Sequence, residues 1–428
     1  MLNLIGVIVA FVVIIILIRS KFDFFPFIKN YIFGLSLILG SLIIGVFSLQ
    51  EIKPIEIPKA MIEASFYSFK TKQIVTETIE LATLMTLIYI LAKLMQETGA
   101  IKKLIDSLRT FFSKGGTLGV IPAVYGLMPV PGGALFSAPM IAEEGEKYSL
   151  NNNQKNLLNI WFRHIWFPIY PISSAMILVC SVEFSNIDIY TLILANFVSF
   201  ITSVSIGFIL LKKFIKNVPE QKTKTEKEYS GLIYLLPPVT PLFFYIILQF
   251  FGFPQVRSFI IGVMFSIILL YFLTKSKLKE YLVFIKNSFT IKLALAIFGI
   301  MIFREMFEVS KANVVIADAI SGLAFPAIVI VIIMPLLLGL LTGYNLGAIA
   351  LSYFLVQPFF GLTNVSILGL TSIIFMGSFV GYLISPIHLC NVLSSDYLKT
   401  DTTRMYKIFI PAAIFLLLVQ VVFVVLFF

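Results

Sequence analysis

The sequence predicts an all-α polytopic membrane protein built from two inverted repeats, each with five transmembrane helices and one re-entrant hairpin. Of the 428 residues, 59% are hydrophobic and only 13% are charged, whereas soluble domains carry roughly 25% charged residues. Many windows of about 20 residues lack a charge and are long enough to cross a bilayer as a helix. The lipid bilayer is therefore the first predicted partner.

A second observation is that one pattern occurs twice. Lys93-x-Met95-x-Glu97 in the first half corresponds to Arg304-x-Met306-x-Glu308 in the second, 211 residues later. Glu97 lies 35 residues before Gly132, and Glu308 lies 35 residues before Gly343. Duplicated membrane halves with interrupted helices are typical of alternating-access transporters, because irregular backbone in a membrane must be buried in protein or line a cavity.

The third observation is the distribution of positive charge. Two apolar stretches, about 117–142 and 325–360, are predicted as re-entrant hairpins, because full spans there would break the alternation of lysine-rich loops. All lysine-rich loops then share one side, which the positive-inside rule makes cytoplasmic, and both termini lie outside. The remaining spans are predicted near 2–18, 31–49, 78–96, 157–181, 189–211, 231–251, 257–274, 289–308, 366–394 and 408–428.

An odd number of spans in each half inverts the second copy relative to the first. We predict a first repeat over 1–215, a cytoplasmic linker over 216–230 and a second repeat over 231–428. The linker is polar and rich in lysine and glutamate, as expected of a flexible connection. The lysines and arginines behind the net charge of +10 lie in loops between spans. The positive-inside rule explains this distribution, so nucleic acid is not a predicted partner.

The hairpin tips are the first candidates for substrate binding. In the first hairpin, Pro131 lacks an amide donor and Gly132 and Gly133 permit non-helical backbone, so the helix must break there. The helix that resumes, with Ser137 one turn in, points its positive end at the gap and would stabilise an anion. The alternative is a proline kink packed on neighbouring helices. The second tip offers the corresponding candidates Thr342, Gly343 and Asn345.

A long helix with internal prolines follows each hairpin. The first carries Arg163 and His164, and Pro168 and Pro171 should unwind it beside Ser173. An Arg–His pair inside a span is costly unless it is paired, hydrated or functional. Arg163 could instead extend to the cytoplasmic surface, since it lies near the predicted start of its span.

The corresponding helix of the second half supplies Ser385 and His388, followed by Cys390. His388 could exchange protons or serve only as a structural hydrogen-bonding residue. Neither histidine has the neighbouring ligands that zinc needs, so no such metal site is predicted. Coupling sodium ions are expected at the hairpin tips near Gly132 and Gly343.

These motifs resemble those of a known superfamily. The hairpin tips, each followed by a broken helix, are similar to those of the ion transporter superfamily of divalent-anion/sodium symporters, citrate-type carriers and gluconate permeases. The segments 161–171 and 385–390 resemble an uncharacterised prokaryotic integral-membrane family within it. The resemblance implies an elevator-type carrier in the inner membrane, commonly a homodimer. No Ser-Asn-Thr stands at either tip, so dicarboxylate substrates are not implied.

The predicted function is therefore secondary active transport of a small organic anion, a symport coupled to sodium or protons, with no enzyme activity and no cofactor besides the coupling ion. A cation/proton antiporter is the alternative, although no predicted span carries Asp or Glu at its middle. An intramembrane enzyme would pair His164 with Ser173 or Ser174, but no acid orients the histidine and no nucleophile motif is present. A non-transport membrane subunit is a further alternative.

Overall fold

The computed structural model describes residues 2–20, 26–112, 115–127, 133–215, 228–321 and 326–428. Nine candidate membrane spans, judged by helix length and apolar composition, lie within these ranges. The prediction of a multi-pass α-helical membrane protein is therefore confirmed. Most of the predicted linker, residues 216–227, and the hairpin-tip residues 128–132 lie outside the described residues.

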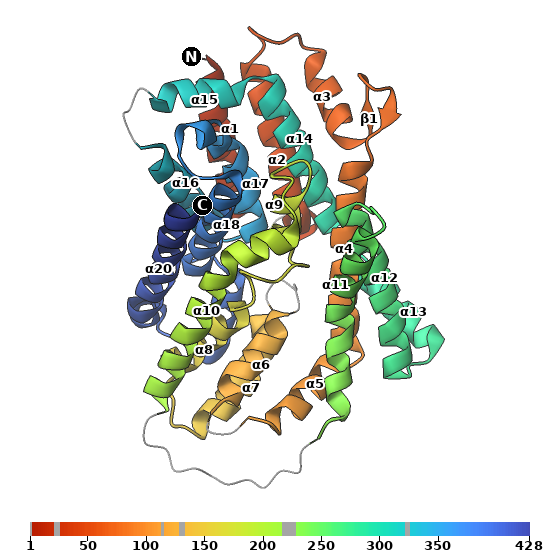
Figure 1. Cartoon of the computed structure of the whole chain (residues 1–428), viewed down its shortest axis with the longest axis vertical. Helices are drawn as coiled ribbons and strands as arrows, with labels where there is room; N and C mark the ends of the chain where they lie inside the picture. The colour runs from red at the N-terminus through yellow and green to blue at the C-terminus, as the bar shows by residue number, and fades with distance from the viewer. Residues whose placement is uncertain (1, 21–25, 113–114, 128–132, 216–227, 322–325) are drawn as a thin grey trace.

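The helices divide into two packed groups and a few connecting elements (Figure 1). The first helix group occupies the upper middle and right of the view, and its members pack mainly against one another. It consists of α1 (Leu2–Arg19), α2 (Pro26–Phe47), α3 (Glu56–Ser65), α4 (Thr76–Glu97), α11 (Leu236–Gln249), α12 (Gln255–Thr274), α13 (Leu278–Ser288) and α14 (Lys292–Val309).

The second helix group occupies the left and lower part of the same view. It gathers both hairpin regions and both broken helices that the sequence predicts. Its members are α6 (Thr117–Gly126), α7 (Ala134–Glu146), α8 (Asn152–His164), α9 (Ser174–Cys180), α10 (Ile189–Phe214), α16 (Ala327–Thr342), α17 (Asn345–Val356), α18 (Ile367–Ile384), α19 (Leu389–Leu398) and α20 (Thr402–Phe427).

Short elements that the sequence analysis did not predict join the two groups. Helices α5 (Ala100–Arg109) and α15 (Ala312–Ser321) each lead from the first group into a hairpin region, and they lie toward opposite ends of the long axis (Figure 1). Helix α5 packs on the 3-10 helix η1 (Ser230–Leu235), where the amide of Gly231 donates to Ser107 Oγ at 2.9 Å. The other elements are η2 (Gln357–Leu362) and the paired strands β1 (Tyr67–Ser68) and β2 (Gln73–Ile74).

The predicted helix interruptions are present. Helix α8 ends at His164 and α9 begins at Ser174, and the segment between them contains Pro168 and Pro171. Helix α18 ends at Ile384, and α19 begins only after Pro386. Each predicted hairpin region likewise consists of two successive helices, as proline and glycine at these positions require.

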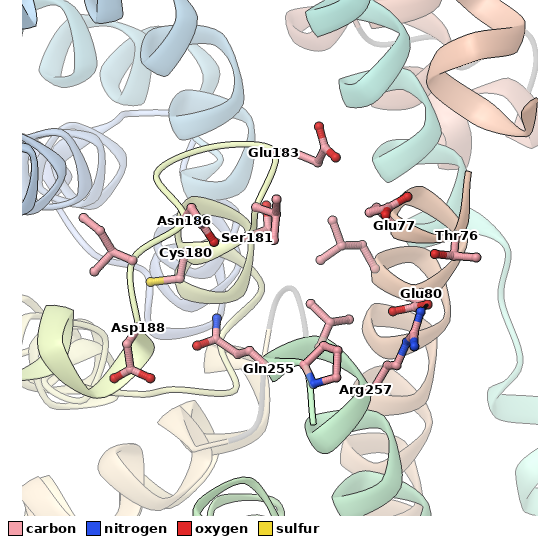
Figure 2. A pocket seen from close by; sticks show the side chains of 15 residues that line it. Thr76, Glu77, Glu80, Cys180, Ser181, Glu183, Asn186, Asp188, Gln255 and Arg257 are labelled. Carbon is pink, nitrogen blue, oxygen red and sulfur yellow. Dashed lines mark hydrogen bonds and ion pairs between the residues drawn. The ribbon is translucent and has the colours of Figure 1, made fainter. Parts of the chain in front are cut away.

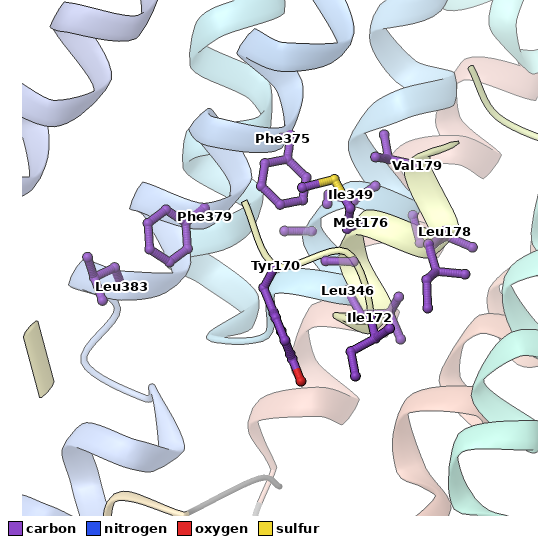
Figure 3. Packing of buried hydrophobic residues seen from close by; sticks show 14 of the residues in the cluster. Tyr170, Ile172, Met176, Leu178, Val179, Leu346, Ile349, Phe375, Phe379 and Leu383 are labelled. Carbon is purple, nitrogen blue, oxygen red and sulfur yellow. The ribbon is translucent and has the colours of Figure 1, made fainter. Parts of the chain in front are cut away.

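Close backbone packing makes α18 the centre of the second helix group. A Cβ on Gly381 would lie 2.1 Å from the carbonyl oxygen of Leu336, so α16 and α18 approach each other only because this residue is glycine. On another face, Phe375 and Phe379 of α18 pack near Met176 of α9 (Figure 3). The broken helices therefore rest on a rigid, tightly packed base.

Candidate functional site

The interruptions of the two broken helices meet inside the second helix group. The ring of His164, at the end of α8, lies 4.8 Å from the ring of His388, measured between centroids. His164 Nε2 also lies 3.2 Å from the hydroxyl of Tyr382, near the end of α18. Segments more than 200 residues apart in the chain thus form one buried centre.

The end of α8 and the segment after it bind the carboxyl end of α6, the first hairpin helix. Three side chains donate to carbonyls at alternate residues near the end of α6, where a helix terminus leaves carbonyls able to accept further bonds. These bonds are Trp166 Nε1 to Ala123 O at 3.0 Å, Arg163 to Tyr125 O at 2.9 Å, and Tyr170 Oη to Leu127 O at 2.6 Å. The broken helix therefore fixes the position where the first hairpin turns.

Arg163 lies between the two helices of the first hairpin. Its residue is only 3% exposed, so its guanidinium does not extend to the surface. A Cβ on Gly133 would lie 2.1 Å from the terminal nitrogen Nη2 of Arg163, so the arginine occupies the space that glycine leaves at the start of α7. The guanidinium therefore lies close to the amino end of α7 while it donates to the carboxyl end of α6. Pro131 and Gly132 lie outside the described residues.

The tip of the second hairpin lies against the other interruption. Gly343 adopts a φ of 60°, and a Cβ there would lie 2.7 Å from the side chain of Ile387. Thr342 donates its hydroxyl to Leu338 O, and Ser385 donates to Leu340 O, both at 2.7 Å. These two hydroxyls therefore hold backbone in place, and glycine occupies the position of close approach at Gly343, as it does at Gly133.

Asn345, at the start of α17, is a predicted site residue whose side-chain amide has no partner among the described residues. It is 4% exposed, and neither its side-chain oxygen nor its nitrogen has a hydrogen-bond partner within the ranges that the structure describes. A buried amide without partners costs free energy in the ligand-free protein. We infer that this amide is available to a bound molecule.

Ser137 and Ser173 have structural partners. Ser137 donates to Asn159 Oδ1 at 2.6 Å, and Asn159 in turn donates to Ser394 Oγ at 2.8 Å, so a buried network joins α7, α8 and α19. Ser173 caps α9 by accepting from the amide of Met176. Both hydroxyls are thus used in positioning helices, and the role of Asn159 in organising the network was not predicted.

The different roles of the buried residues Asn159 and Asn345 can be tested by thermal unfolding. We expect Asn159→Leu to lower the melting temperature of the detergent-solubilised, ligand-free protein, because several hydrogen bonds are lost and their partners stay buried, at about 1–3 kcal/mol per unsatisfied group. Asn345→Leu should leave that temperature unchanged or raise it, since an unsatisfied amide is removed. A large loss of stability in Asn345→Leu would show that the amide has a partner in the folded protein.

One family model covers nearly the whole chain. It is described as "Protein of unknown function (DUF401)" and matches residues 35–426. The chain belongs to the DUF401 family. No curated protein matches it.

The DUF401 chain shares its fold with a solved membrane transporter. The structure of the YdaH transporter of Alcanivorax borkumensis, which is described as having an unusual topology, superimposes with a TM-score of 0.59. The match covers 92% of the DUF401 chain and 96% of the other chain at 11% sequence identity. The likeness therefore concerns the fold.

A pocket of ≈ 450 Å³ lies between the two helix groups of this DUF401 protein (Figure 2). Glu77 and Glu80 of α4 face it from the first group, and Glu183 and Asp188 face it from the segment between α9 and α10. The contacts that cross between the groups here include an ion pair of Arg304 with Glu183 and a hydrogen bond from the Tyr245 hydroxyl to Asp188. This pocket was not predicted, because its lining residues come from three segments that lie far apart in the chain.

The DUF401 structure also brings His164, His388 and Cys390 together. One ligand atom from each residue lies within 4.8 Å of the others, and all three residues are buried. No metal ligation was predicted from the sequence, because neither histidine has the neighbouring ligands in the chain that zinc needs. The cluster forms only because the broken helices meet. Cys180 and Cys390 are both free and buried.

Proposed function

We propose that this protein is a secondary active transporter that moves a small organic anion by an elevator-type, alternating-access mechanism coupled to sodium or protons. The observation that carries the proposal is the position of Arg163, buried between the negative end of α6 and the positive end of α7. Such a site attracts an anion to the arginine and to the amides of α7. Membership of the ion transporter superfamily is part of the same proposal.

The positions of the helices support two inverted repeats, 1–215 and 231–428, joined by a cytoplasmic linker over 216–230. Helices α5, α7 and α10 begin 212, 211 and 213 residues before α15, α17 and α20, respectively. Those offsets agree with the displacement of 211 seen in the motifs. We propose that the regions 117–142 and 325–360 are re-entrant hairpins that enter from opposite sides, with the helices α5 and α15 toward opposite ends of the molecule (Figure 1).

The division into two helix groups supports an elevator mechanism. The second group contains both hairpin regions and both broken helices, so it would carry the substrate, and the first group would remain fixed in the membrane. The connecting helices α5 and α15 would allow the relative movement. We propose a homodimer in the prokaryotic inner membrane with both termini outside, in keeping with the lysine-rich loops.

The buried centre favours symport over cation/proton antiport. The charged side chain found beside the hairpin ends is a cation, Arg163, whereas an exchange site for protons or sodium usually needs a buried carboxylate. Sodium sites at the tips near Gly132 and Gly343 would be formed by carbonyl oxygens freed where the helices break. Such a cation would offset the charge of the anion as both cross.

Transport is tested by uptake in proteoliposomes. We expect radiolabelled organic anions from a panel of mono-, di- and tricarboxylates and sugar acids to accumulate when a sodium or proton gradient is imposed. Dissipating each gradient separately with an ionophore identifies the coupling ion. Protein-free liposomes and a Gly133→Leu variant are the controls. Absence of gradient-dependent uptake for every anion class would contradict the proposal.

A further inference from the structure

The cluster of His164, His388 and Cys390 has the composition of a transition-metal site. Two imidazoles and one thiol have ligand atoms within 4.8 Å of one another, and the residues are 2%, 0% and 5% exposed. We propose that these three side chains bind a thiophilic d¹⁰ ion, Zn²⁺ or Cu⁺, through two imidazole nitrogens and one thiolate. Nitrogen and sulfur ligands select such ions over sodium, magnesium and calcium, which prefer oxygen.

Both imidazoles are oriented as metal ligands usually are. His164 Nδ1 lies 2.6 Å from Ile160 O, and His388 Nδ1 lies 3.4 Å from Leu383 O. Donation of Nδ1–H to a backbone carbonyl fixes the tautomer and leaves a lone pair on Nε2, as in most metal-binding histidines. At His164 this lone pair faces the Tyr382 hydroxyl at 3.2 Å, which a bound metal would displace. His388 Nε2 is fully buried and has no hydrogen-bond partner within the described residues. A buried nitrogen of this kind needs a proton donor or a metal.

The helix that carries the thiol favours its ionised form. Cys390 lies in the first turn of the ten-residue helix α19, and His388 directly precedes that helix. Free amides at a helix start stabilise a thiolate. Binding releases the thiol proton to solvent as the sulfur–metal bond forms.

The charges allow two arrangements at this centre. A thiolate and two neutral imidazoles carry one negative charge, so Cu⁺ gives a neutral three-coordinate site beside the positive guanidinium of Arg163, the residue before His164. Zn²⁺ leaves one positive charge and a fourth position open to water or an anion. In either case the ligand atoms must move closer, because nitrogen and sulfur ligands of one zinc ion lie about 3.5 Å apart. Rotation of side chains at the two helix interruptions can supply that movement.

The metal content of the purified protein tests this proposal independently of transport. Full-length protein is expressed in medium supplemented with Zn²⁺ or Cu⁺, purified in detergent and assayed by mass spectrometry of the metals. We expect about one ion per chain for the preferred metal. The double variant His388→Gln/Cys390→Ser should retain less than a tenth of that amount. Cys180→Ser is the matched control, because Cys180 is also buried in a short helix after an interruption, and it should keep the wild-type content.

Spectroscopy distinguishes ligation at the cluster from metal bound elsewhere. X-ray absorption of the loaded protein should show a sulfur ligand, at about 2.3 Å for zinc, and the single variants Cys390→Ser and His388→Gln should remove the sulfur or one nitrogen. Each variant is scored only on its monodisperse fraction, so that misfolding does not mimic metal loss. Wild-type protein with no more metal than the double variant, or an ion without sulfur ligation, would overturn the proposal. Both results are independent of whether an anion is transported.

Discussion

Replacing Gly133 with leucine is expected to reduce substrate uptake to background. A Cβ at this position would already lie 2.1 Å from the guanidinium of Arg163, and the rest of a leucine side chain would fill the space at the start of α7. Arg163 would have to leave Tyr125 O, and the amides of α7 would be covered. Initial uptake in proteoliposomes, at matched protein density, measures the effect.

Gly361→Leu is the matched control for this substitution. A Cβ on Gly361 meets nothing within 4 Å, so the same added side chain should leave uptake close to the wild-type rate. Size-exclusion chromatography of both variants shows whether they fold. Uptake near the wild-type rate in folded Gly133→Leu would remove the first hairpin tip from the substrate site.

Arg163→Gln is expected to weaken the substrate affinity at least tenfold, which corresponds to about 1.4 kcal/mol. Glutamine keeps a polar N–H donor on a shorter side chain, while the positive charge is lost. Arg163→Lys keeps the charge but loses the planar fork, and its loss of affinity should be clearly smaller. The substrate concentration for half-maximal uptake, measured for all three proteins, gives the comparison.

Lys155→Gln controls for the loss of a buried cation on the same helix. Lys155 is buried in α8, more than two turns before Arg163, and pairs with Glu146. We expect the substrate affinity of the Lys155→Gln variant to equal that of the wild type. If both Arg163 variants also behaved like wild type, the arginine would have no part in binding the anion.

The sequence predicted the interruptions because proline and glycine act locally. Pro168, Pro171 and Pro386 remove backbone donors wherever the chain is folded, and each lies between two helices in the structure. The charge-free spans were equally predictable from length and composition. By contrast, α5 and α15 were missed, since each has only ten residues, about half the length by which a membrane span is recognised.

The direction of the Arg163 side chain, toward the surface or into the protein, could not be predicted from its position in the chain. A residue near the start of a span can extend to the surface or turn inward, and the choice depends on partners elsewhere. Its observed partner is a carbonyl at the end of α6, freed because that helix terminates. Likewise, the approach of His164 to His388 depends on how two distant helices pack.

The two tryptophans near the first hairpin provide an intrinsic fluorescence signal for its conformation. Both tryptophans of the chain, Trp161 and Trp166, flank Arg163 by two and three residues. Trp166 donates to Ala123 O on α6, whereas Trp161 donates to Ser203 O on α10. Any rearrangement of α6 changes the environment of one indole and leaves the other as an internal reference. Ultraviolet emission can therefore follow the opening of this hairpin in unlabelled protein, in real time.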